Sequence, residues 1–471
     1  MSYKLYDYQK RIIKAQKTFI KGKIDFRAQI YAGTGAGKTV CFNTLIANEL
    51  AKNPNLRVLV AHPRIALSDD QQYRTLMDLG YATEVNGKLQ MIDNPNLLEI
   101  TNFHSSSVKN HPMGLGRKCQ NTTNPEALEE IRETTPGAHM TFTTYHSLGG
   151  IADLDYDLVI CDEAHYLVNT QFRESLHKFR PDVKVLFYTA TPIYVAASDE
   201  CMSNLDLFGK VIATVPPKEA IKAGRVVPPK MLFINCERQK EGNTIDDVNI
   251  IGISMREQLA EAKVDNPGVV HKMLVAMSTT MRFTDIRDRI ADIRNICDNS
   301  HIDIYTVSAD AVIKNHGGKD SAWYGSNRRK DGLDDFKSNP NPCVIVHCDT
   351  IAEGIDISGI SGELILRDVK MSKAMQTIGR GSRTAPGKTF NYVCIVTVDG
   401  IHLAGQDLAW FTQLFREFGY NDIVEELQHK LEEGFGAEID EFLGKDDAEL
   451  DEYKTIETSF EDILSDFGVK L

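Results

Sequence analysis

The sequence lacks the features that define several large classes of protein. It has nine cysteines but no C-x-x-C pair, which disfavours both a zinc ribbon and a framework of disulfides. No apolar run approaches the ~18 residues that a membrane-spanning helix needs, and residues 1–7 carry no apolar signal core. We therefore expect a cytoplasmic protein without a membrane partner. The spacings of one polar group match no standard metal site, so we interpret its members as loop residues: His104, His111, Cys119 and His139.

The chain also lacks any overall excess of positive charge. Its formal net charge is −13. Residues 421–471 hold 17 acidic and 4 basic side chains, which leaves 49 of each sign in residues 1–420. A nucleic-acid partner would therefore have to be held by local basic patches, because no overall positive field attracts phosphates.

What the sequence does contain is a glycine-rich loop in the context that phosphate binding requires. Residues 32–39 read AGTGAGKT, between a strand pattern at 27–31 and a helical pattern at 40–50. In such loops the backbone N–H groups wrap the phosphates, the lysine reaches the β and γ phosphates, and the threonine hydroxyl meets Mg²⁺. The sequence therefore predicts a nucleotide site formed by Gly33, Thr34, Gly35, Ala36, Gly37, Lys38 and Thr39.

An acidic pair supplies the carboxylates that this loop lacks. Asp162 and Glu163 directly follow the apolar run 157–161, and Ala164 and His165 complete the sequence DEAH. The run is typical of a buried strand. The carboxylates would then emerge at the carboxyl end of that strand, which is the edge where α/β sheets bind ligands. An exposed acidic cluster is the alternative when the four residues are taken alone.

Short apolar strands alternate with helical patterns in two successive sets, which predicts an α/β fold of two parallel-sheet domains. The first set occupies residues 1–215, with strands near 29–31, 57–61, 139–143, 158–161 and 183–188. The second occupies residues 269–400, with strands near 273–277, 302–307, 343–347, 363–366 and 392–396. We expect a loop-rich insertion at about 81–136, a linker and insertion at 216–268, and an acidic, mainly helical C-terminal region at 401–471.

Further motifs occur in a set order along the chain. They are Tyr8 with Gln9, and residues 61–67 (AHPRIAL), 144–148 (TYHSL), 189–192 (TATP), 349–356 (DTIAEGID) and 376–383 (QTIGRGSR). With the loop and the acidic pair, this series resembles the superfamily 2 DEAD/DEAH-box helicases over residues 5–400. Within them it is most similar to UvsW-like phage helicases, RadD-like proteins and the motor (Res) subunits of restriction enzymes. The resemblance implies two tandem RecA-like domains with an ATP cleft between them, in the cytoplasm of a bacterium or a phage-infected host.

The resemblance implies a role for each motif in ATP hydrolysis with Mg²⁺. Lys38 neutralises phosphate charge, Glu163 orients and deprotonates the attacking water, and Thr39 and Asp162 hold the metal. From the second domain, Gln376 lies near the γ phosphate and Arg380 and Arg383 act as arginine fingers. The remaining positions read adenine (Gln9), link the nucleotide to the second domain (Gly354 and Asp356), or couple the motifs (His165, Thr189 and Thr191).

The implied nucleic-acid contacts lie in loops that follow the strands of both sheets. Hydroxyl and guanidinium groups suit phosphate oxygens, which carry no sequence information. Binding is therefore expected to tolerate any sequence and to weaken with salt. The positions are Arg64, Thr144, Ser278, Thr279 and Thr350.

The leading hypothesis is a nucleic-acid-stimulated ATPase: a DNA helicase or translocase that unwinds or remodels single-stranded, duplex or branched DNA. An RNA helicase uses the same core. A hypothesis from another class is an ATP-gated nucleic-acid clamp without processive unwinding. Two interpretations of the acidic residues 421–471 stay open: amphipathic helices packed on the second domain, or a tail that inhibits by imitating nucleic acid or docks a protein partner.

Overall fold

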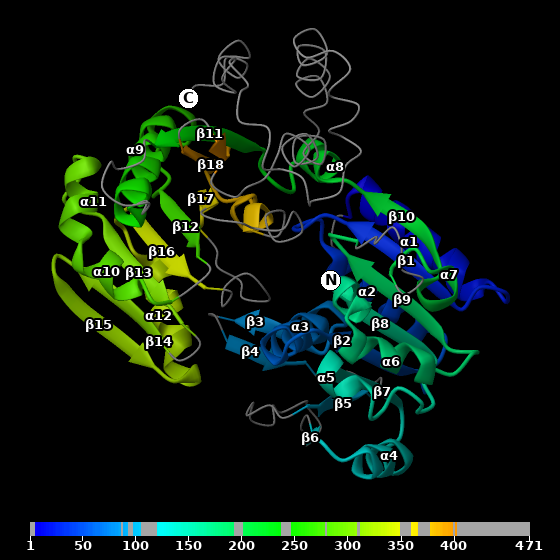
Figure 1. The fold of residues 1–471 in the computed structure, drawn as a ribbon. Helices are drawn as coiled ribbons and strands as arrows, with labels where there is room; N and C mark the ends of the chain where they lie inside the picture. The colour runs from blue at the N-terminus through cyan, green and yellow to red at the C-terminus, as the bar shows by residue number, and fades with distance from the viewer. Residues whose placement is uncertain are drawn as a thin grey trace, which may run out of the picture. The chain divides into compact units, whose positions relative to one another are not determined.

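The computed structural model describes residues 5–85, 88–92, 98–104, 120–192, 201–236, 246–277, 280–308, 311–348, 359–365, 377–398 and 401–402. The chain divides into two compact units, residues 1–219 and 220–471 (Figure 1). Each unit is built around one large sheet.

The first unit contains an eight-stranded sheet in the order β10-β1-β9-β8-β2-β7-β5-β6, and the pairings between these strands are parallel. Its strands are β1 (Arg27–Ala32), β2 (Arg57–His62), β5 (Leu98–Phe103), β6 (Gln120–Thr122), β7 (Ala138–Thr144), β8 (Leu158–Asp162), β9 (Lys184–Thr189) and β10 (Lys210–Val215). A separate hairpin is formed by β3 (Ala82–Val85) and β4 (Lys88–Met91).

Helices accompany this sheet, and several of them connect its parallel strands, as is usual for parallel pairing. They are α1 (Asp7–Lys21), α2 (Lys38–Leu50), α3 (Ile65–Asp78), α4 (Pro125–Thr134), α5 (Tyr145–Leu148), the 3₁₀ helix η1 (Ala164–Val168), α6 (Thr170–Lys178), α7 (Leu205–Phe208) and α8 (Pro217–Lys222). The central strands β8 and β9 are buried along their whole length. This burial explains why their sequences are apolar except at the strand ends, because a sheet covered on both faces has no solvent side for polar residues.

Strand β5 lies in the stretch that we expected to be a loop-rich insertion. All six of its residues are buried although Glu99 and Asn102 are polar. Asn102 Nδ2 donates a hydrogen bond to Asn121 Oδ1 (2.8 Å), and Gln120 Nε2 donates to Glu99 Oε1 (3.4 Å). Burial of polar side chains is tolerated when they are hydrogen-bonded. The polar residues that resemble a loop in the sequence therefore pair between β5 and the edge strand β6.

The second unit contains a nine-stranded sheet with the main order β11-β18-β17-β12-β16-β13-β14-β15, and β19 pairs with β18. The strands are β11 (Pro229–Cys236), β12 (Lys272–Ala276), β13 (Asp303–Val307), β14 (Ala311–His316), β15 (Lys319–Tyr324), β16 (Cys343–His347), β17 (Gly362–Ile365), β18 (Asn391–Val398) and β19 (Ile401–His402). The pairings from β11 to β13 are parallel, whereas β14, β15 and β19 pair antiparallel.

The helices named in the described part of this unit are α9 (Asp247–Asp265), α10 (Phe283–Asp288), α11 (Ile290–Ile296) and α12 (Ser326–Ser338). Residues Val248, Ile251 and Met255 of α9 are fully buried in the same apolar cluster as Met273 and Val275 of β12. The stretch 216–268, expected as a linker and insertion, thus contributes β11 to the sheet and α9 to its cover. Among the residues described, no helix is both long and apolar enough to span a membrane.

Candidate nucleotide site

The glycine-rich loop joins β1 to α2 and takes the shape that its glycines permit. Gly35 and Gly37 have φ values of 81° and 84°, a region that L-residues with a side chain rarely adopt. The N–H of Ala36 donates to the carbonyl of Gly33 (3.1 Å), and the N–H of Gly33 donates to Val215 of β10 (3.2 Å). The loop therefore ends in the N-terminus of α2, whose dipole and N–H groups favour an anion.

Lys38 brings the loop and the acidic pair together. Its Nζ lies 3.3 Å from Glu163 Oε1, and the Lys38 side chain is only 10% exposed. Nζ also donates a long hydrogen bond to the carbonyl of Ala32 (3.5 Å). Thr39, the second residue of α2, is half-buried beside it. The ammonium group predicted to meet phosphates is thus held at the end of β1, next to the carboxylate predicted to activate water.

Asp162 and Glu163 lie at the carboxyl end of β8, as predicted. Glu163 has φ 53° and ψ 47°, the left-handed conformation, and its N–H donates to Asp162 Oδ1 (3.1 Å). The hydroxyl of Tyr145 donates to the carbonyl of Asp162 (2.5 Å). Burial and the neighbouring Glu163 charge raise the pKa of Asp162 to about 7, against the opposing effect of Lys38. An excess of buried negative charge is the environment that a cation would stabilise.

The residues around Asp162 fit a magnesium ion by their chemistry. Carboxylate and hydroxyl oxygens are the ligands that Mg²⁺ prefers. His62 Nδ1 lies 3.7 Å from Asp162 Oδ2, but burial lowers the pKa of His62 to about 3. A neutral imidazole cannot balance the carboxylate, which leaves Lys38 as the nearby positive charge and makes the site suited to a cation.

The three predicted coupling residues contact one another. His165 Nδ1 lies 2.9 Å from Thr189 Oγ1 and 3.5 Å from Thr191 Oγ1. The N–H of Thr191 donates to Thr189 Oγ1 (3.0 Å). His165 Nδ1 is also 3.6 Å from Glu163 Oε2, and burial lowers the pKa of His165. The end of β9 is therefore connected to the acidic pair through the imidazole of His165.

Gln9 lies on the buried face of α1, directly beside the loop. Its Nε2 donates to the carbonyl of Ala36 (3.0 Å), and its Oε1 accepts from the N–H of Tyr6 (3.1 Å). A Cβ on Gly37 would come within 2.5 Å of Gln9 Nε2. In this structure the Gln9 amide ties α1 to the phosphate loop.

In the second unit, the arginine motif forms a short helical segment. Residues 377–381 are helical, and Arg380 and Arg383 are half-buried. The carbonyl of Ser382 accepts from the N–H of Val227 (2.7 Å), and Arg383 forms an isolated β-bridge with Val226. Gln376, Gly354 and Asp356 lie outside the described residues, as do Ser278, Thr279 and Thr350.

Two of the predicted nucleic-acid residues follow neighbouring strands of the first sheet. Arg64 is exposed just before α3, and Thr144 ends β7, whose register pairs it with His62 of β2. Thr144 is 4% exposed, and its hydroxyl donates to Ser147 Oγ (3.4 Å). The structure therefore places both residues at one edge of the sheet, with Arg64 on the surface and the Thr144 side chain buried.

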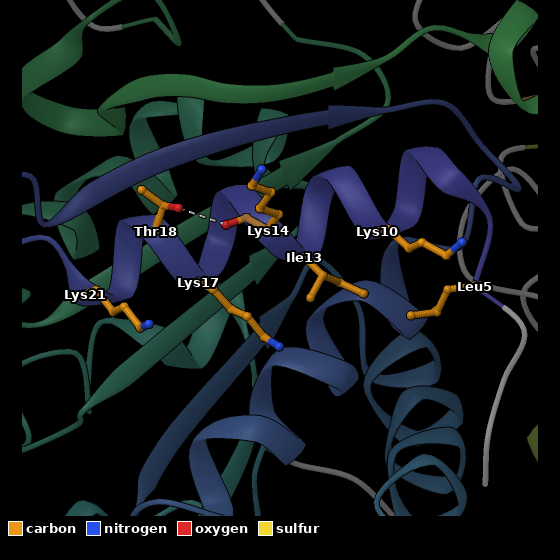
Figure 2. Close-up of a pocket in the computed structure, with 7 residues that line it drawn as sticks. All are labelled: Leu5, Lys10, Ile13, Lys14, Lys17, Thr18 and Lys21. Carbon is orange, nitrogen blue, oxygen red and sulfur yellow. Dashed lines mark hydrogen bonds between the residues drawn. The ribbon is translucent and has the colours of Figure 1, made fainter.

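A basic surface that our sequence analysis did not identify lies on α1. Its hollow of about 440 Å³ is lined by Leu5, Lys10, Ile13, Lys14, Lys17, Thr18 and Lys21 (Figure 2). Three of the four lysines are exposed, and Lys17 is half-buried. The spacing of the lysines at intervals of four, three and four residues could have revealed this surface, because such positions share one face of a helix.

The two sheets with their flanking helices have the fold of the tandem RecA-like domains found in helicases. Residues 2–194 match the family described as the res subunit of Type III restriction enzymes. The match covers less than half of the chain, and it supports the resemblance of this region to helicases of the Res type. No curated protein matches the sequence.

Solved structures share the fold at low sequence identity. The Type ISP restriction-modification enzyme LlaBIII bound to DNA matches with a TM-score of 0.63 and 17% identity, over 91% of this chain and 30% of that one. A nuclease-deletion mutant of the Type ISP enzyme LlaGI with a DNA substrate mimic gives 0.59 and 16%, over 94% and 32%. The DUF1998 helicase MrfA bound to DNA gives 0.50 and 14%, over 88% and 48%. This chain thus spans about a third of the Type ISP enzymes and about half of MrfA.

Proposed function

We propose that the first unit binds ATP with Mg²⁺ and hydrolyses it. The main support is the contact between Lys38 Nζ and Glu163 Oε1 at 3.3 Å, beside Asp162 at the end of β8. A phosphate placed on the loop would take the place of the Glu163 carboxylate as the partner of Lys38. Glu163 would then be released to orient and deprotonate a water molecule.

Asp162 and Thr39 would hold the magnesium ion, which supplies charge neutralisation on the β and γ phosphates. Asp162 suits this role because its main-chain carbonyl is fixed by Tyr145 and its side chain accepts from the N–H of Glu163. His165, which contacts Glu163, Thr189 and Thr191, would couple a movement of the Glu163 side chain to the end of β9. Gln9 would support the loop from α1 and read adenine from there.

We further propose that Arg380 and Arg383 stabilise negative charge that develops in the transition state. Because these arginines belong to the second unit, such a role makes turnover depend on how the two units are arranged. Gln376, Gly354 and Asp356 are assigned to the same step by their motifs. ATP hydrolysis would in this way drive a change between the units.

The proposed substrate is DNA, and the proposed activity is helicase or translocase. DNA is favoured over RNA by similarity, because the LlaBIII and MrfA structures are described as bound to DNA. The backbone contacts assigned by their motifs are Arg64 and Thr144 at the edge of the first sheet, with Ser278, Thr279 and Thr350 farther along the chain. The lysines of α1 offer an additional cationic surface to phosphates.

Side-by-side ATPase assays test the proposal. The chain is given matched single-stranded DNA, duplex, fork, four-way junction or RNA, and the stimulation of ATP turnover is measured. Stimulation by DNA with strand displacement under multiple turnover supports a DNA helicase. Preferential stimulation by RNA favours the RNA helicase. ATP-dependent binding without processive unwinding favours the clamp.

A further inference from the structure

The arginine motif of the second unit rests on two buried charges of opposite sign. Glu363 on β17 is 0% exposed and Lys388, just before β18, is 7% exposed. Gly381 of the motif lies between them. Its N–H donates to Glu363 Oε1 (2.7 Å), and its carbonyl accepts from Lys388 Nζ. One residue of the motif is thus held at both ends by charged side chains.

Lys388 uses all its hydrogen-bonding capacity on backbone carbonyls. Besides Gly381, its Nζ donates to Ile360 (2.7 Å) and Arg383 (3.2 Å). An ammonium group has three donors, so these three acceptors match it. Two of the three carbonyls belong to the arginine motif itself, which places the positive charge directly beneath the segment.

Glu363 is matched in the same way by donors. Asn391 Nδ2 donates to Glu363 Oε2 (2.9 Å), while Gly381 serves the other oxygen. Burial raises the pKa of Glu363, and the hydrogen bonds from Asn391 and Gly381 and the charges of Lys388 and Arg380 oppose that rise. Burial likewise lowers the pKa of Lys388, opposed by Glu363. The donors around the acid and the acceptors around the amine favour the ionised pair.

The segment packs against this network without space for a side chain. A Cβ added to Gly381 would overlap Asn391 Oδ1. On the other side, the N–H of Val227 fixes the carbonyl of Ser382. The backbone between Arg380 and Arg383 is therefore constrained by a strand, by a bridge and by two charges.

We propose that Glu363 and Lys388 are positioning residues for the arginine motif: by holding Gly381 at both ends, they fix the backbone that carries Arg380 and Arg383. This inference rests on the proposed role of these arginines in ATP hydrolysis. Each charge also bonds to the sheet beside it, Glu363 to Asn391 of β18 and Lys388 to Ile360 just before β17. The two charges therefore connect the motif to the sheet through Gly381.

The test separates turnover from binding in the full chain. Glu363→Gln keeps the shape of the side chain and removes its charge, and Lys388→Met removes the opposite charge. Each variant should lower kcat of the DNA-stimulated ATPase about 10-fold while KM for ATP stays within about 3-fold, because a displaced arginine acts on the transition state. Thermal unfolding identifies a temperature at which each variant is folded.

A double variant provides the rescue. Glu363→Gln combined with Asn391→Asp returns one carboxylate to the same buried pocket, and the glutamine amide introduced on β17 can donate to it. We expect the double variant to recover most of the lost kcat. It also keeps the test decisive if Glu363→Gln alone proves too unstable to assay.

A matched control lies at the other side of the same sheet. Asp303 on β13 is 1% exposed, accepts from Asn339 Nδ2 (2.7 Å), and lies 2.6 Å from His316 Nδ1. Asp303→Asn should lower the unfolding temperature and leave kcat within about 2-fold of wild type, since it removes a buried charge remote from the motif. A kcat loss as large as that of Glu363→Gln would assign the effect to general stability and overturn the inference.

Arg380→Ala and Arg383→Ala, measured in parallel, separate the two proposals. If the arginine variants keep wild-type kcat, the proposed role of the arginines fails. If the arginine variants lose turnover while folded Glu363→Gln and Lys388→Met keep it, the arginines act as proposed and the positioning role alone is wrong.

Discussion

The two units each place functional charged side chains beside parallel strands of their sheet, but they hold these side chains by different means. In the first unit the backbone itself is shaped: Gly35, Gly37 and Glu163 adopt positive φ values. In the second unit, the arginine motif begins as an ordinary helical turn, and the side chains of Glu363 and Lys388 form hydrogen bonds with its backbone at Gly381. A site shaped by its backbone needs glycine at set positions, so it is visible in the sequence. A site positioned by side chains from other parts of the chain leaves no such pattern in the sequence.

Lys38→Ala should have the largest effect, because it removes the charge that meets the phosphates. We expect ATP turnover to fall on the order of 10³-fold, whereas Glu163→Gln should retain ATP binding and stabilise the ATP-bound state. Steady-state ATPase and nucleotide-binding assays measure both. Lys52→Ala, an exposed lysine just after α2, is the control. Turnover above a tenth of wild type in Lys38→Ala would refute the assignment.

Arg383→Ala tests the corresponding role in the second unit. The guanidinium is expected to act on transition-state charge, so kcat should fall about 10²-fold with little change in ATP affinity. Measuring kcat and KM separately decides this. A raised KM with unchanged kcat would place Arg383 outside the γ-phosphate site.

Gly381→Ala probes the side-chain-held segment by sterics. The new methyl group would overlap Asn391 Oδ1, and overpacking of this kind costs about 3 kcal/mol of unfolding free energy. Gly150→Ala is the matched control, because its Cβ would make only ordinary contacts, the nearest at 3.5 Å to Ser147. Chemical denaturation measures both. Equal stabilities of the two variants would show that the segment around Gly381 can shift to accommodate a methyl group and is not tightly constrained.

The burial of His271 is expected to make the second unit less stable at acidic pH. Its Nδ1 lies 3.0 Å from Ser361 Oγ and its Nε2 2.9 Å from Gln258 Oε1, and burial lowers its pKa to about 3. Below pH 6.5, the ordinary pKa of histidine, His271 is protonated in the unfolded chain but stays neutral in the folded chain. The free energy of unfolding therefore falls as the pH drops. From pH 7 to pH 5 the loss should be about 2 kcal/mol. Urea titrations of the second unit's transition should show this loss in wild type and a smaller one in His271→Gln.

The lysine surface on α1 should give the smallest effect. Replacing exposed Lys14 and Lys21 with glutamine should lower the slope of log K against log salt by about one for each of these lysines that binds a phosphate. DNA-binding titrations at several salt concentrations measure the slope, with Lys52→Gln as control. An unchanged slope would remove α1 from the nucleic-acid surface.

The sequence predicted the α/β fold class and the central strands, because β8, β9, β12 and β16 are buried on both faces and read as apolar runs. It did not predict β5 and β6, because the buried polar residues of β5 pair with half-buried polar residues of β6 and both resemble a loop in the sequence. The phosphate loop and the acidic pair were found because their chemistry needs fixed residues at fixed spacing. Glu363 and Lys388 were missed, since a charged residue in a sequence gives no sign that it will be buried against a partner.

Glu163 sits in the left-handed backbone region, which costs a non-glycine residue about 1–2 kcal/mol. A screen that selects variants for heat resistance alone would therefore be drawn to glycine at this position, which relieves that cost. Such a variant would be more durable and, on the proposed chemistry, inactive. At position 163, selection for thermal stability would therefore favour glycine, whereas selection for ATP turnover would favour glutamate.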